Sequence, residues 1–335
     1  MLKGFTTGTT AAGAAKAAAM MLLTATPPPA VDVTIPSGHI LTLNVKTAKY
    51  NDKKTVTVSI IKDAGSDPDV TNAIEIEATV CLNEVQQGVF ISGGRGVGVV
   101  TKPGLQVPPG SHAINPVPIS MITHSIREVI PNDGVNVAIA AIGGEDIAQL
   151  TFNPRLGILG GISIIGTKGI VEPMSVDAIR QTIKCEVDVS FEEDNGLNLY
   201  VAPGKIGEAA LCRIFGAVRV IHMSNFVGFT LGYAKKKGVQ HLIIGGHPGK
   251  LAKILMGYMD THSKNSPQAT NFVADFLSIN GQFNTVEQII ELNQVEKFNY
   301  LAYKIAEKIV ELFSFKSVAV YLFDMKKSLI GKGYV

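Results

Sequence analysis

Short apolar segments alternate with glycine turns and helix-like segments through the C-terminal half of this sequence, and this alternation restricts the fold more than any other feature. It occurs three times in succession, over residues 198–216, 218–238 and 239–259. Strands that alternate with helices in this way are typical of a parallel sheet with helices on its faces. The pattern predicts a Rossmann-like, doubly wound α/β domain, which we place at residues 193–335.

The N-terminal half has a different pattern, in which segments of period two are joined by short turns. The expected elements are, in chain order, a helix from about residue 9 to 26, strands at 31–35, 40–45 and 54–61, a helix at 115–130 and a strand at 135–142. The first two strands flank a Pro-Ser-Gly turn and predict a hairpin. We therefore expect a mixed or antiparallel α+β domain over residues 1–192, so that the fold class is α/β and α+β.

The composition excludes several classes of protein. The chain has 335 residues, a formal net charge of +2, few aromatic side chains and no tryptophan, which does not resemble the basic, aromatic surface of a nucleic-acid binder. Cys81, Cys185 and Cys212 are scattered and follow neither a disulfide pattern nor a zinc pattern. We expect a cytoplasmic protein that binds no nucleic acid.

An apolar, Ala-rich run at residues 11–23 superficially resembles a signal peptide. Lys16 interrupts it, and a charge within the apolar region of a signal peptide is costly. We interpret the run as an amphipathic or buried helix. No other apolar stretch reaches the roughly 18 residues that span a bilayer, so no membrane association is expected.

Residues 151–175 combine five glycines with branched apolar side chains and only three charged residues, Arg155, Lys168 and Glu172. Glycines in such surroundings indicate a buried backbone that is approached closely by a ligand or by another strand. The segment is predicted to form a binding surface. A buried turn region, packed for structural reasons alone, is an equally weighted alternative.

Two glycine turns of the C-terminal half follow predicted strands, and ligands of doubly wound sheets bind at that end of the strands. The first turn contains Gly204 and Gly207, and the second contains Gly245, Gly246 and His247. Neither turn matches a dinucleotide or P-loop fingerprint. Tight strand-to-helix turns also occur for structural reasons, and this alternative has equal weight.

The segment KDAGSDPDV at residues 62–70 places three aspartates in a turn. Asp63 and Asp69 are candidates for acid or base chemistry, whereas the spacing of a calcium loop is absent and no protein-bound metal is expected. Aspartates in turns also cap their own backbone, and this structural alternative remains open.

Eight segments of the chain, in order, resemble the cobalt-precorrin-5B (C1)-methyltransferase family, CbiD. They are GFTTGT (4–9), KDAGSDPDV (62–70), GVGVVTKPGLQVPPG (96–110), AINPVP (113–118), residues 151–175, SNFVG (224–228), GGHPGKLAK (245–253) and DTHS (260–263). The resemblance implies methyl transfer from S-adenosylmethionine to carbon 1 of a cobalt corrinoid, giving cobalt-precorrin-6A in anaerobic cobalamin biosynthesis. Cobalt then enters only as part of the tetrapyrrole substrate.

The resemblance, combined with the predicted turns, gives three sets of site residues. The cofactor would be bound by Gly204, Gly207, Ser224, Asn225, Gly245, Gly246 and His247. The corrinoid would be bound by Lys62, Lys102, Asn153, Arg155, Lys168, Glu172 and His262, with Arg155 as the foremost partner for a substrate carboxylate. Asp63, Asp69 and His247 are the candidates for proton transfer.

Two other functions remain open on the residues alone. An enzyme of phosphoryl transfer would use GGHPGK to bind a nucleotide, and a non-catalytic protein would bind the corrinoid without changing it. The sequence also leaves open whether the chain forms a homo-oligomer.

Overall fold

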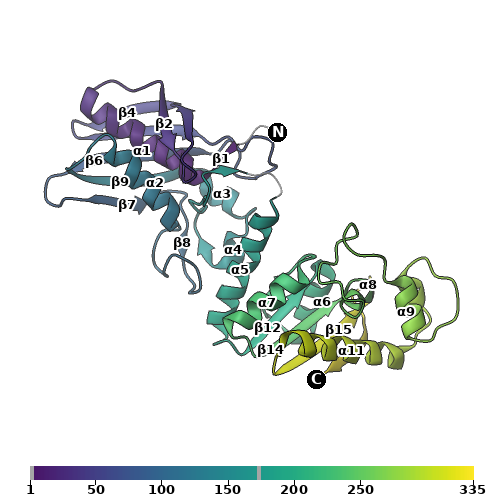
Figure 1. Ribbon diagram of the computed structural model, residues 1–335. Helices are drawn as coiled ribbons and strands as arrows, with labels where there is room; N and C mark the ends of the chain where they lie inside the picture. The colour runs from purple at the N-terminus through teal and green to yellow at the C-terminus, as the bar shows by residue number, and fades with distance from the viewer. Residues whose placement is uncertain (1–3, 172–174) are drawn as a thin grey trace. The chain divides into compact units, whose positions relative to one another are not determined.

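The computed structural model describes residues 4–171 and 175–335. The chain divides into two compact units, Met1–Ser175 and Val176–Val335, which we call the N-terminal and C-terminal units. Each unit combines helices with β-sheet, so the expected mixture of α and β structure is confirmed (Figure 1).

The N-terminal unit is built mainly from strands. They are β1 (Gly4–Phe5), β2 (Ala30–Thr34), β3 (Ile40–Asn44), β4 (Thr47–Asp52), β5 (Thr55–Ile61), β6 (Glu75–Asn83), β7 (Val89–Gly93), β8 (Val99–Val100), β9 (Gly134–Ile142), β10 (Ile158–Leu159) and β11 (Ile170–Val171). Its helices are α1 (Thr7–Thr24), α2 (Pro116–Arg127), α3 (Gly144–Ala148) and α4 (Asn153–Leu156).

Five of these strands form the main sheet, in the order β4-β5-β6-β9-β7. All neighbours are antiparallel except β7 and β9, which are parallel, so the sheet is mixed. Strands β2 and β3 pair with each other as the predicted hairpin. Helices α1 and α2 lie along one face of the main sheet (Figure 1), where alternate side chains of β5, β6 and β9 are buried beneath them.

Helix α1 confirms the helix expected from the Ala-rich run. It begins after Thr6, whose hydroxyl accepts a hydrogen bond from the backbone N–H of Thr9, and it ends at Thr24, before Pro27. Seven alanines between Ala11 and Ala19 are fully buried, because small side chains allow the helix to pack closely on the sheet and on α2. Within residues 4–171 and 175–335, no helix is long and apolar enough to span a bilayer.

The C-terminal unit alternates strands and helices. Its strands are β12 (Asn198–Ala202), β13 (Val220–His222), β14 (His241–Gly246), β15 (Ser317–Phe323) and β16 (Leu329–Tyr334). Its helices are α5 (Val176–Glu193), α6 (Lys205–Phe215), α7 (Val227–Lys237), α8 (Pro248–Leu251), the 3-10 helix η1 (Ala252–Ile254), α9 (Thr270–Phe276), α10 (Val286–Ile290) and α11 (Val295–Phe313).

The C-terminal strands form one sheet in the order β13-β12-β14-β15-β16. The first four strands are parallel, and β16 is antiparallel to β15. Helix α6 packs on one face through Ala210 and Leu211, whereas α5, α7 and α11 pack on the other face. The carboxyl ends of β12, β13 and β14 therefore lie at the same edge of the sheet. This arrangement was expected from the strands that precede the two glycine turns.

The division between the units falls earlier than the boundary expected between residues 192 and 193. Helix α5 belongs to the C-terminal unit because its Ile183 and Val187 are buried in the same core as strand β12. The hydroxyl of Tyr233 also donates a hydrogen bond to Asp188 of this helix. Residues 194–196, which follow α5, therefore form a turn inside the C-terminal unit.

Candidate functional site

The described part of the glycine-rich segment, residues 151–171, is held in the N-terminal unit by other backbone segments. Strand β10 pairs with β8, Ile162 and Ile164 form single bridges to Val97 and Ile114, and β11 pairs with β1. A side chain at Gly161 would lie 2.2 Å from the carbonyl oxygen of Gly96. At Gly161, the close approach predicted from the glycines is therefore made by the backbone of Gly96. Gly157 and Gly169 are instead approached by the side chains of Lys102 and Ile35.

The predicted substrate residues of this segment have different surroundings. Asn153 is buried, and its amide is satisfied by internal hydrogen bonds. Its Nδ2 donates to the Gly161 carbonyl at 3.0 Å, and its Oδ1 accepts from the Ser163 hydroxyl at 3.1 Å. Arg155 is half-buried at the end of α4, and Lys168 is exposed. The remaining predicted residue, Glu172, lies outside the described residues.

Lys102 lies beside the same segment. A side chain at Gly157 would lie 2.5 Å from its Cγ, so the aliphatic part of Lys102 covers this glycine, and Lys102 itself is half-buried. The sequence placed Lys102 and Arg155 in separate motifs, and the contact between Lys102 and the end of α4 brings the two motifs together.

The KDAGSDPDV segment forms a tight turn after β5. Lys62 is buried, and its Nζ lies 2.8 Å from Oδ2 of Asp69. Burial opposes ionisation of Asp69, but the hydrogen bonds from Lys62 and Thr71 keep the pKa of its carboxyl below the ordinary value. Asp69 is thereby kept ionised.

Asp63 lies at the exposed start of the same turn. Its Oδ1 accepts the backbone N–H of Gly65 at 2.7 Å, as in the turn-capping alternative, and its other oxygen has no partner among the described residues. In the described part of the chain, no three His, Cys, Asp or Glu side chains are arranged to bind a metal ion.

Two threonines that sequence reasoning did not select connect these motifs. The hydroxyl of Thr9 donates to the Gly169 carbonyl at 2.6 Å, and the hydroxyl of Thr7 accepts the N–H of Ile165 at 2.9 Å. The backbone N–H of Phe5 donates to the Asp63 carbonyl. The segment 4–9 thus fixes the aspartate turn and the glycine-rich segment relative to each other. The sequence predicted the start of a helix near these threonines, but not their contacts with the glycine-rich segment.

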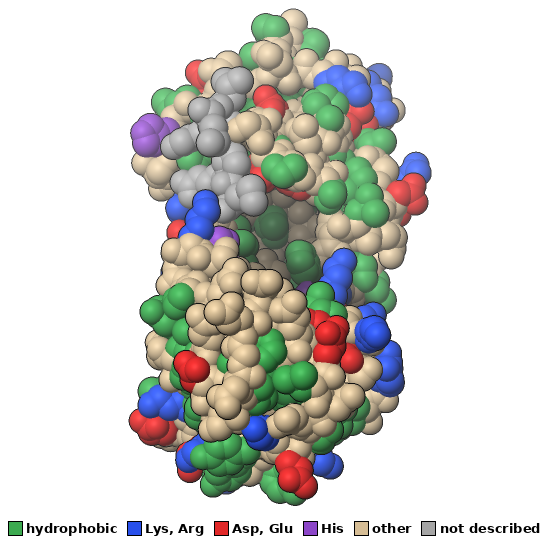
Figure 2. Space-filling view, turned by 90° about the vertical axis from the view of Figure 1, so that its right-hand side faces the viewer, with side chains coloured by type: hydrophobic (Ala, Val, Ile, Leu, Met, Phe, Trp, Pro, Cys, Tyr) green, Lys and Arg blue, Asp and Glu red, His purple; other side chains and the backbone are tan. Residues whose placement is uncertain are grey.

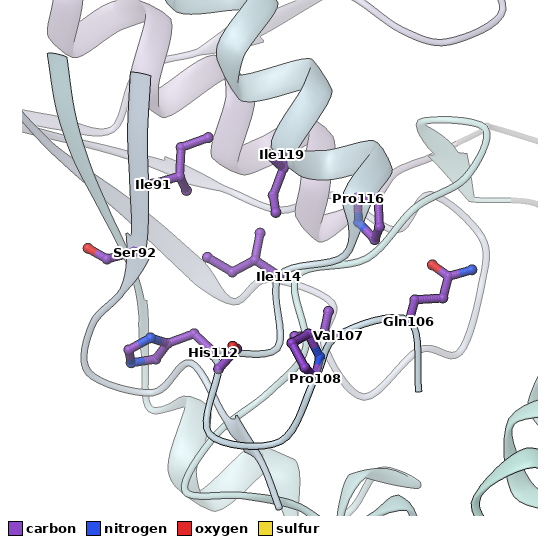
Figure 3. Close-up of a pocket in the computed structure, with 10 residues that line it drawn as sticks. Ile91, Ser92, Gln106, Val107, Pro108, His112, Ile114, Pro116 and Ile119 are labelled. Carbon is purple, nitrogen blue, oxygen red and sulfur yellow. The ribbon is translucent and has the colours of Figure 1, made fainter. Parts of the chain in front are cut away.

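A cavity of about 380 Å³ opens in the N-terminal unit beside β7 and the start of α2. Figure 3 shows that Ile91, Ile114 and Ile119 converge on it, whereas Ser92 and His112 lie on one side. A second cavity, of about 350 Å³, shares Ile91 and Ser92 and extends over Cys81 and Asn136 on the open face of the sheet. As far as the chain is described, none of the predicted substrate residues lines either cavity.

In the C-terminal unit, the glycine turns lie at the carboxyl edge of the sheet. A side chain at Gly207 would lie 2.1 Å from the carbonyl oxygen of Gly245, and one at Gly245 would lie 2.7 Å from Leu211. A side chain at Gly246 would touch Pro203. Internal packing therefore explains three of the four predicted glycines. Gly204 differs, because a side chain there would meet no atom within 4 Å.

The other residues predicted to bind the cofactor lie at the same carboxyl edge of the C-terminal sheet. Ser224 and Asn225 follow β13, and Ser224 has a positive φ of 51°. Nζ of Lys250, which follows β14, donates to Oδ1 of Asn225 at 3.1 Å. His262 is near them, since the N–H of the preceding Thr261 donates to the Asn225 carbonyl.

His247 caps helix α8. Its Nδ1 accepts the N–H of Gly249 at 3.1 Å, and its Nε2 lies 3.0 Å from Oε2 of Glu287. Both ring nitrogens are thus engaged within the C-terminal unit. The N–H of Gly249 is also no longer available to an anion, which weakens the phosphate-binding interpretation of GGHPGK.

One face of the molecule carries charged side chains of both signs. On the face shown in Figure 2, Lys and Arg side chains lie among Asp and Glu side chains, without an extended region of one sign. In the C-terminal unit, burial and the nearby charge of Lys253 lower the pKa of the Lys250 ammonium. An anion bound beside Lys250 would favour its charged form.

Comparisons with known proteins give a consistent result. The family model of CbiD matches residues 1–173, which is more than half of the chain. The cobalt-precorrin-5B C(1)-methyltransferase of Thermoanaerobacter sp. (strain X514) is 39% identical over 322 residues, covering 95% of this chain and 87% of that protein. The protein of the same name from Methanocaldococcus jannaschii is 36% identical over 349 residues, covering 98% and 95%.

A crystal structure of the cobalamin biosynthesis protein (cbiD) from Archaeoglobus fulgidus aligns with a TM-score of 0.42 at 29% identity, covering 78% of this chain and 82% of that chain. The family model and the relatives agree with the resemblance carried by the eight segments. The chain belongs to the CbiD family.

Proposed function

We propose that this chain is the methyltransferase that converts cobalt-precorrin-5B into cobalt-precorrin-6A by adding a methyl group from S-adenosylmethionine to carbon 1, a step of anaerobic cobalamin biosynthesis. The observation that carries the proposal is the match to a cobalt-precorrin-5B C(1)-methyltransferase over 95% of this chain at 39% identity. The match extends through both units, so the whole of the proposed activity has a counterpart in this sequence.

We infer that the C-terminal unit is a Rossmann-like, doubly wound domain and that it binds the methyl donor. The strand order β13-β12-β14-β15 has parallel neighbours throughout, and the chain leaves β12 and β14 in opposite directions along the sheet. In such sheets, the crevice at this reversal is the usual ligand site. The turns after β12 and β14 carry Gly204 and His247, which were predicted to contact the cofactor.

The residues at this edge fit a nucleoside ligand. The space beside Gly204 is open, and the first turn of α6 presents backbone N–H groups there. Ser224 and Asn225 add a hydroxyl and an amide from the neighbouring turn. Gly207 and Gly245 support the site indirectly, because their lack of side chains lets α6 lie against β14. Gly246 leaves room for Pro203 in the turn after β12.

S-adenosylmethionine supplies an activated methyl group on a sulfonium, so neither a nucleophilic side chain nor a protein-bound metal is required. The chain has to orient the two ligands and exclude water. The methyl-accepting ring carbon provides an electron pair, and the ring must then lose a proton. We propose that Asp63 accepts this proton, since one of its oxygens has no partner among the described residues. Asp69 and His247, which were predicted with it, act as positioning residues through Lys62 and Glu287.

We propose that the N-terminal unit binds the corrinoid. The substrate carries several carboxylates, and Lys102 and Arg155 supply cationic groups near the end of α4, with Lys168 as a third cation of this unit. Asn153 and Lys62 support that region through internal contacts. Cobalt belongs to the substrate. The cytoplasm is the compartment that this function implies, and the three cysteines, which form no disulfide among the described residues, are compatible with it.

The direct test is mass spectrometry of the corrinoid after incubation of the purified chain with cobalt-precorrin-5B and methyl-labelled S-adenosylmethionine. A product that carries one labelled methyl group at carbon 1, together with S-adenosylhomocysteine, supports the proposal. Tight binding of the corrinoid without methylation would identify a carrier instead, and magnesium-dependent turnover of ATP would identify phosphoryl transfer.

A further inference from the structure

Two lysines that follow β14 are joined to the turn after β13 by a continuous set of hydrogen bonds. Lys250 Nζ donates to Oδ1 of Asn225, and the carbonyl of Asn225 accepts the N–H of Thr261 at 3.0 Å. The carbonyl of Thr261 in turn accepts Nζ of Lys253 at 3.1 Å. We call Lys250, Lys253, Asn225 and Thr261 the lysine cluster.

The positive charge of the lysine cluster is not compensated. Lys253 is only 6% exposed, and its Nζ contacts the Thr261 carbonyl and the Ser266 hydroxyl, which are both neutral. Over the described ranges, neither ammonium has an Asp or Glu oxygen within 4 Å. The acid beside the cluster in sequence, Asp260, is bonded instead to the His262 N–H and to Asn265. Buried cations are normally paired, so a cluster of this kind is suited to an anion.

Thr261 provides an independent observation. It is 3% exposed, and its Oγ1 is the one buried side-chain nitrogen or oxygen without a hydrogen-bond partner in residues 4–171 and 175–335. Buried hydroxyl groups are nearly always satisfied, so an unpaired one marks a place where a ligand or a water completes the structure. This unpaired hydroxyl belongs to the residue that connects Asn225 with Lys253.

The position of the lysine cluster agrees with a ligand site. Asn225 follows β13 and Lys250 follows β14, and β12 lies between these strands in the sheet. The contact between the two residues therefore spans the carboxyl end of β12, next to the open turn at Gly204. This is the edge at which parallel sheets bind ligands.

We propose that the lysine cluster is a carboxylate-binding subsite of the C-terminal unit. The proposal rests on the proposed function for the source of the carboxylate. The methyl donor carries a sulfonium and an ammonium beside its single carboxylate, so two uncompensated lysines repel it overall. The corrinoid carries several carboxylates at its periphery and complements the cluster better. We therefore assign the subsite to an acid side chain of the corrinoid.

The test uses the full chain and four variants. Lys250→Met removes the accessible charge, Lys250→Arg retains it, and Thr261→Val removes the unpaired hydroxyl with little change in shape. Lys236→Met is the matched control, because Lys236 is an exposed lysine of α7 in the same unit. Calorimetry measures the affinity of each protein for cobyrinic acid, cobyrinic acid heptamethyl ester, S-adenosylhomocysteine and 5′-methylthioadenosine, and thermal unfolding verifies that each variant is folded.

We expect Lys250→Met to weaken the binding of cobyrinic acid by about tenfold or more, because a charge-assisted contact is lost. Lys250→Arg should recover most of this loss, and Lys236→Met should change nothing. The ester and S-adenosylhomocysteine should bind all variants equally. If S-adenosylhomocysteine is weakened instead, while 5′-methylthioadenosine and cobyrinic acid are not, the subsite stands and its carboxylate is that of the methyl donor. Equal affinities of wild type and Lys250→Met for all four probes would overturn the subsite.

A separate arm distinguishes failure of the subsite from failure of the proposed function. If the wild type binds neither the corrinoid nor S-adenosylhomocysteine, the proposed function fails. The subsite is then decided by malonate, a small dicarboxylate, in thermal unfolding experiments. Stabilisation of the wild type that disappears in Lys250→Met supports the subsite, and equal stabilisation, or none, overturns it.

Discussion

The side chain of Lys62 is 1% exposed, and its ammonium lies 2.8 Å from the carboxylate of Asp69, in the turn that follows β5. Asp69 also accepts hydrogen bonds from the backbone N–H and the hydroxyl of Thr71. The ion pair of Lys62 and Asp69 therefore stabilises the turn that carries Asp63. Because the turn contacts Phe5, the Lys62–Asp69 pair also holds the segment before α1.

Lys62→Met should lower the free energy of unfolding at neutral pH by about 3 kcal/mol, since it leaves the partly buried Asp69 without its cation. Urea denaturation followed by circular dichroism measures the change. Lys54→Met is the matched control, because Lys54 and Glu84 form an ion pair in which both side chains are 71% exposed. We expect no measurable change for this control.

The same pair predicts a dependence of stability on pH. The folded-state pKa of Asp69 lies below its ordinary value, so its contribution to stability is present above the unfolded pKa and is lost as the pH falls through the folded pKa. In Lys62→Met, only burial and the Thr71 hydrogen bonds remain, and the loss on acidification should become smaller. An unchanged difference between neutral and acidic pH in the variant would contradict the assignment of this dependence to the Lys62–Asp69 pair.

Gly204, the N-cap residue of α6, and Gly207, in the first turn of this helix, should respond differently to substitution. Gly207→Ala places a methyl group 2.1 Å from the Gly245 carbonyl, so we expect a loss of about 3 kcal/mol or more, or failure to fold. Gly204→Ala points into open space from an extended backbone and should leave thermal stability nearly unchanged. A strong destabilisation by Gly204→Ala would show that this turn is not open.

Gly204→Leu extends this comparison to binding. The larger side chain can be accommodated by the protein but occupies the space that we propose for the methyl donor. We expect a folded variant whose affinity for S-adenosylhomocysteine is reduced by about tenfold or more, measured by calorimetry. Full affinity in a folded Gly204→Leu variant would exclude this turn as part of the donor site.

The elements that the sequence predicted are those specified by local periodicity. The Ala-rich helix, the hairpin of β2 and β3, helix α2 and the parallel strands of the C-terminal unit follow from patterns within a few residues of each other. The start of the C-terminal unit was not predicted in this way. Helix α5 has an amphipathic pattern that suits either unit, and only its packing against β12 decides the boundary.

The candidate site was predicted less completely, because its contacts join distant segments. Thr7 and Thr9 bind backbone groups about 160 residues away, and local sequence carries no signal for that pairing. The cavity at His112 was not predicted either, because its lining residues come from β7, a loop and α2, which are distant in the sequence. Gly207 and Gly245 were predicted to bind the cofactor, and the structure shows that each accommodates another part of the protein.

We expect Asn153 to contribute to the stability of the folded protein. Its amide satisfies the Gly161 carbonyl and the Ser163 hydroxyl, and both contacts lie inside the glycine-rich segment. Asn153→Ala leaves a buried carbonyl unpaired, and we expect a loss of about 2 kcal/mol in urea denaturation. Ser163→Ala removes only one of the two contacts and should cost less. If Asn153→Ala reduces corrinoid affinity strongly while stability is unchanged, Asn153 contacts the substrate directly.

The proposed roles of Asp63 and His247 can be distinguished with two conservative variants. Asp63→Asn keeps the oxygen that accepts the Gly65 N–H, so the turn should remain intact, but it removes the proton acceptor. His247→Asn keeps an oxygen that can cap α8, because asparagine is a good N-cap residue. We expect Asp63→Asn to lower kcat by about 100-fold, whereas His247→Asn should retain most of the activity.

Formation of the methylated corrinoid, followed by mass spectrometry over a range of pH, measures both effects. Proton transfer by Asp63 requires that its variant lose the acidic limb of the pH profile of kcat as well as its rate, because a merely structural defect would lower the rate without changing the profile. His247→Asn should leave the profile unchanged, since both nitrogens of the histidine are already engaged by Gly249 and Glu287. Loss of the limb in His247→Asn, with a normal profile in Asp63→Asn, would transfer the proton-accepting role to His247 and to the C-terminal unit.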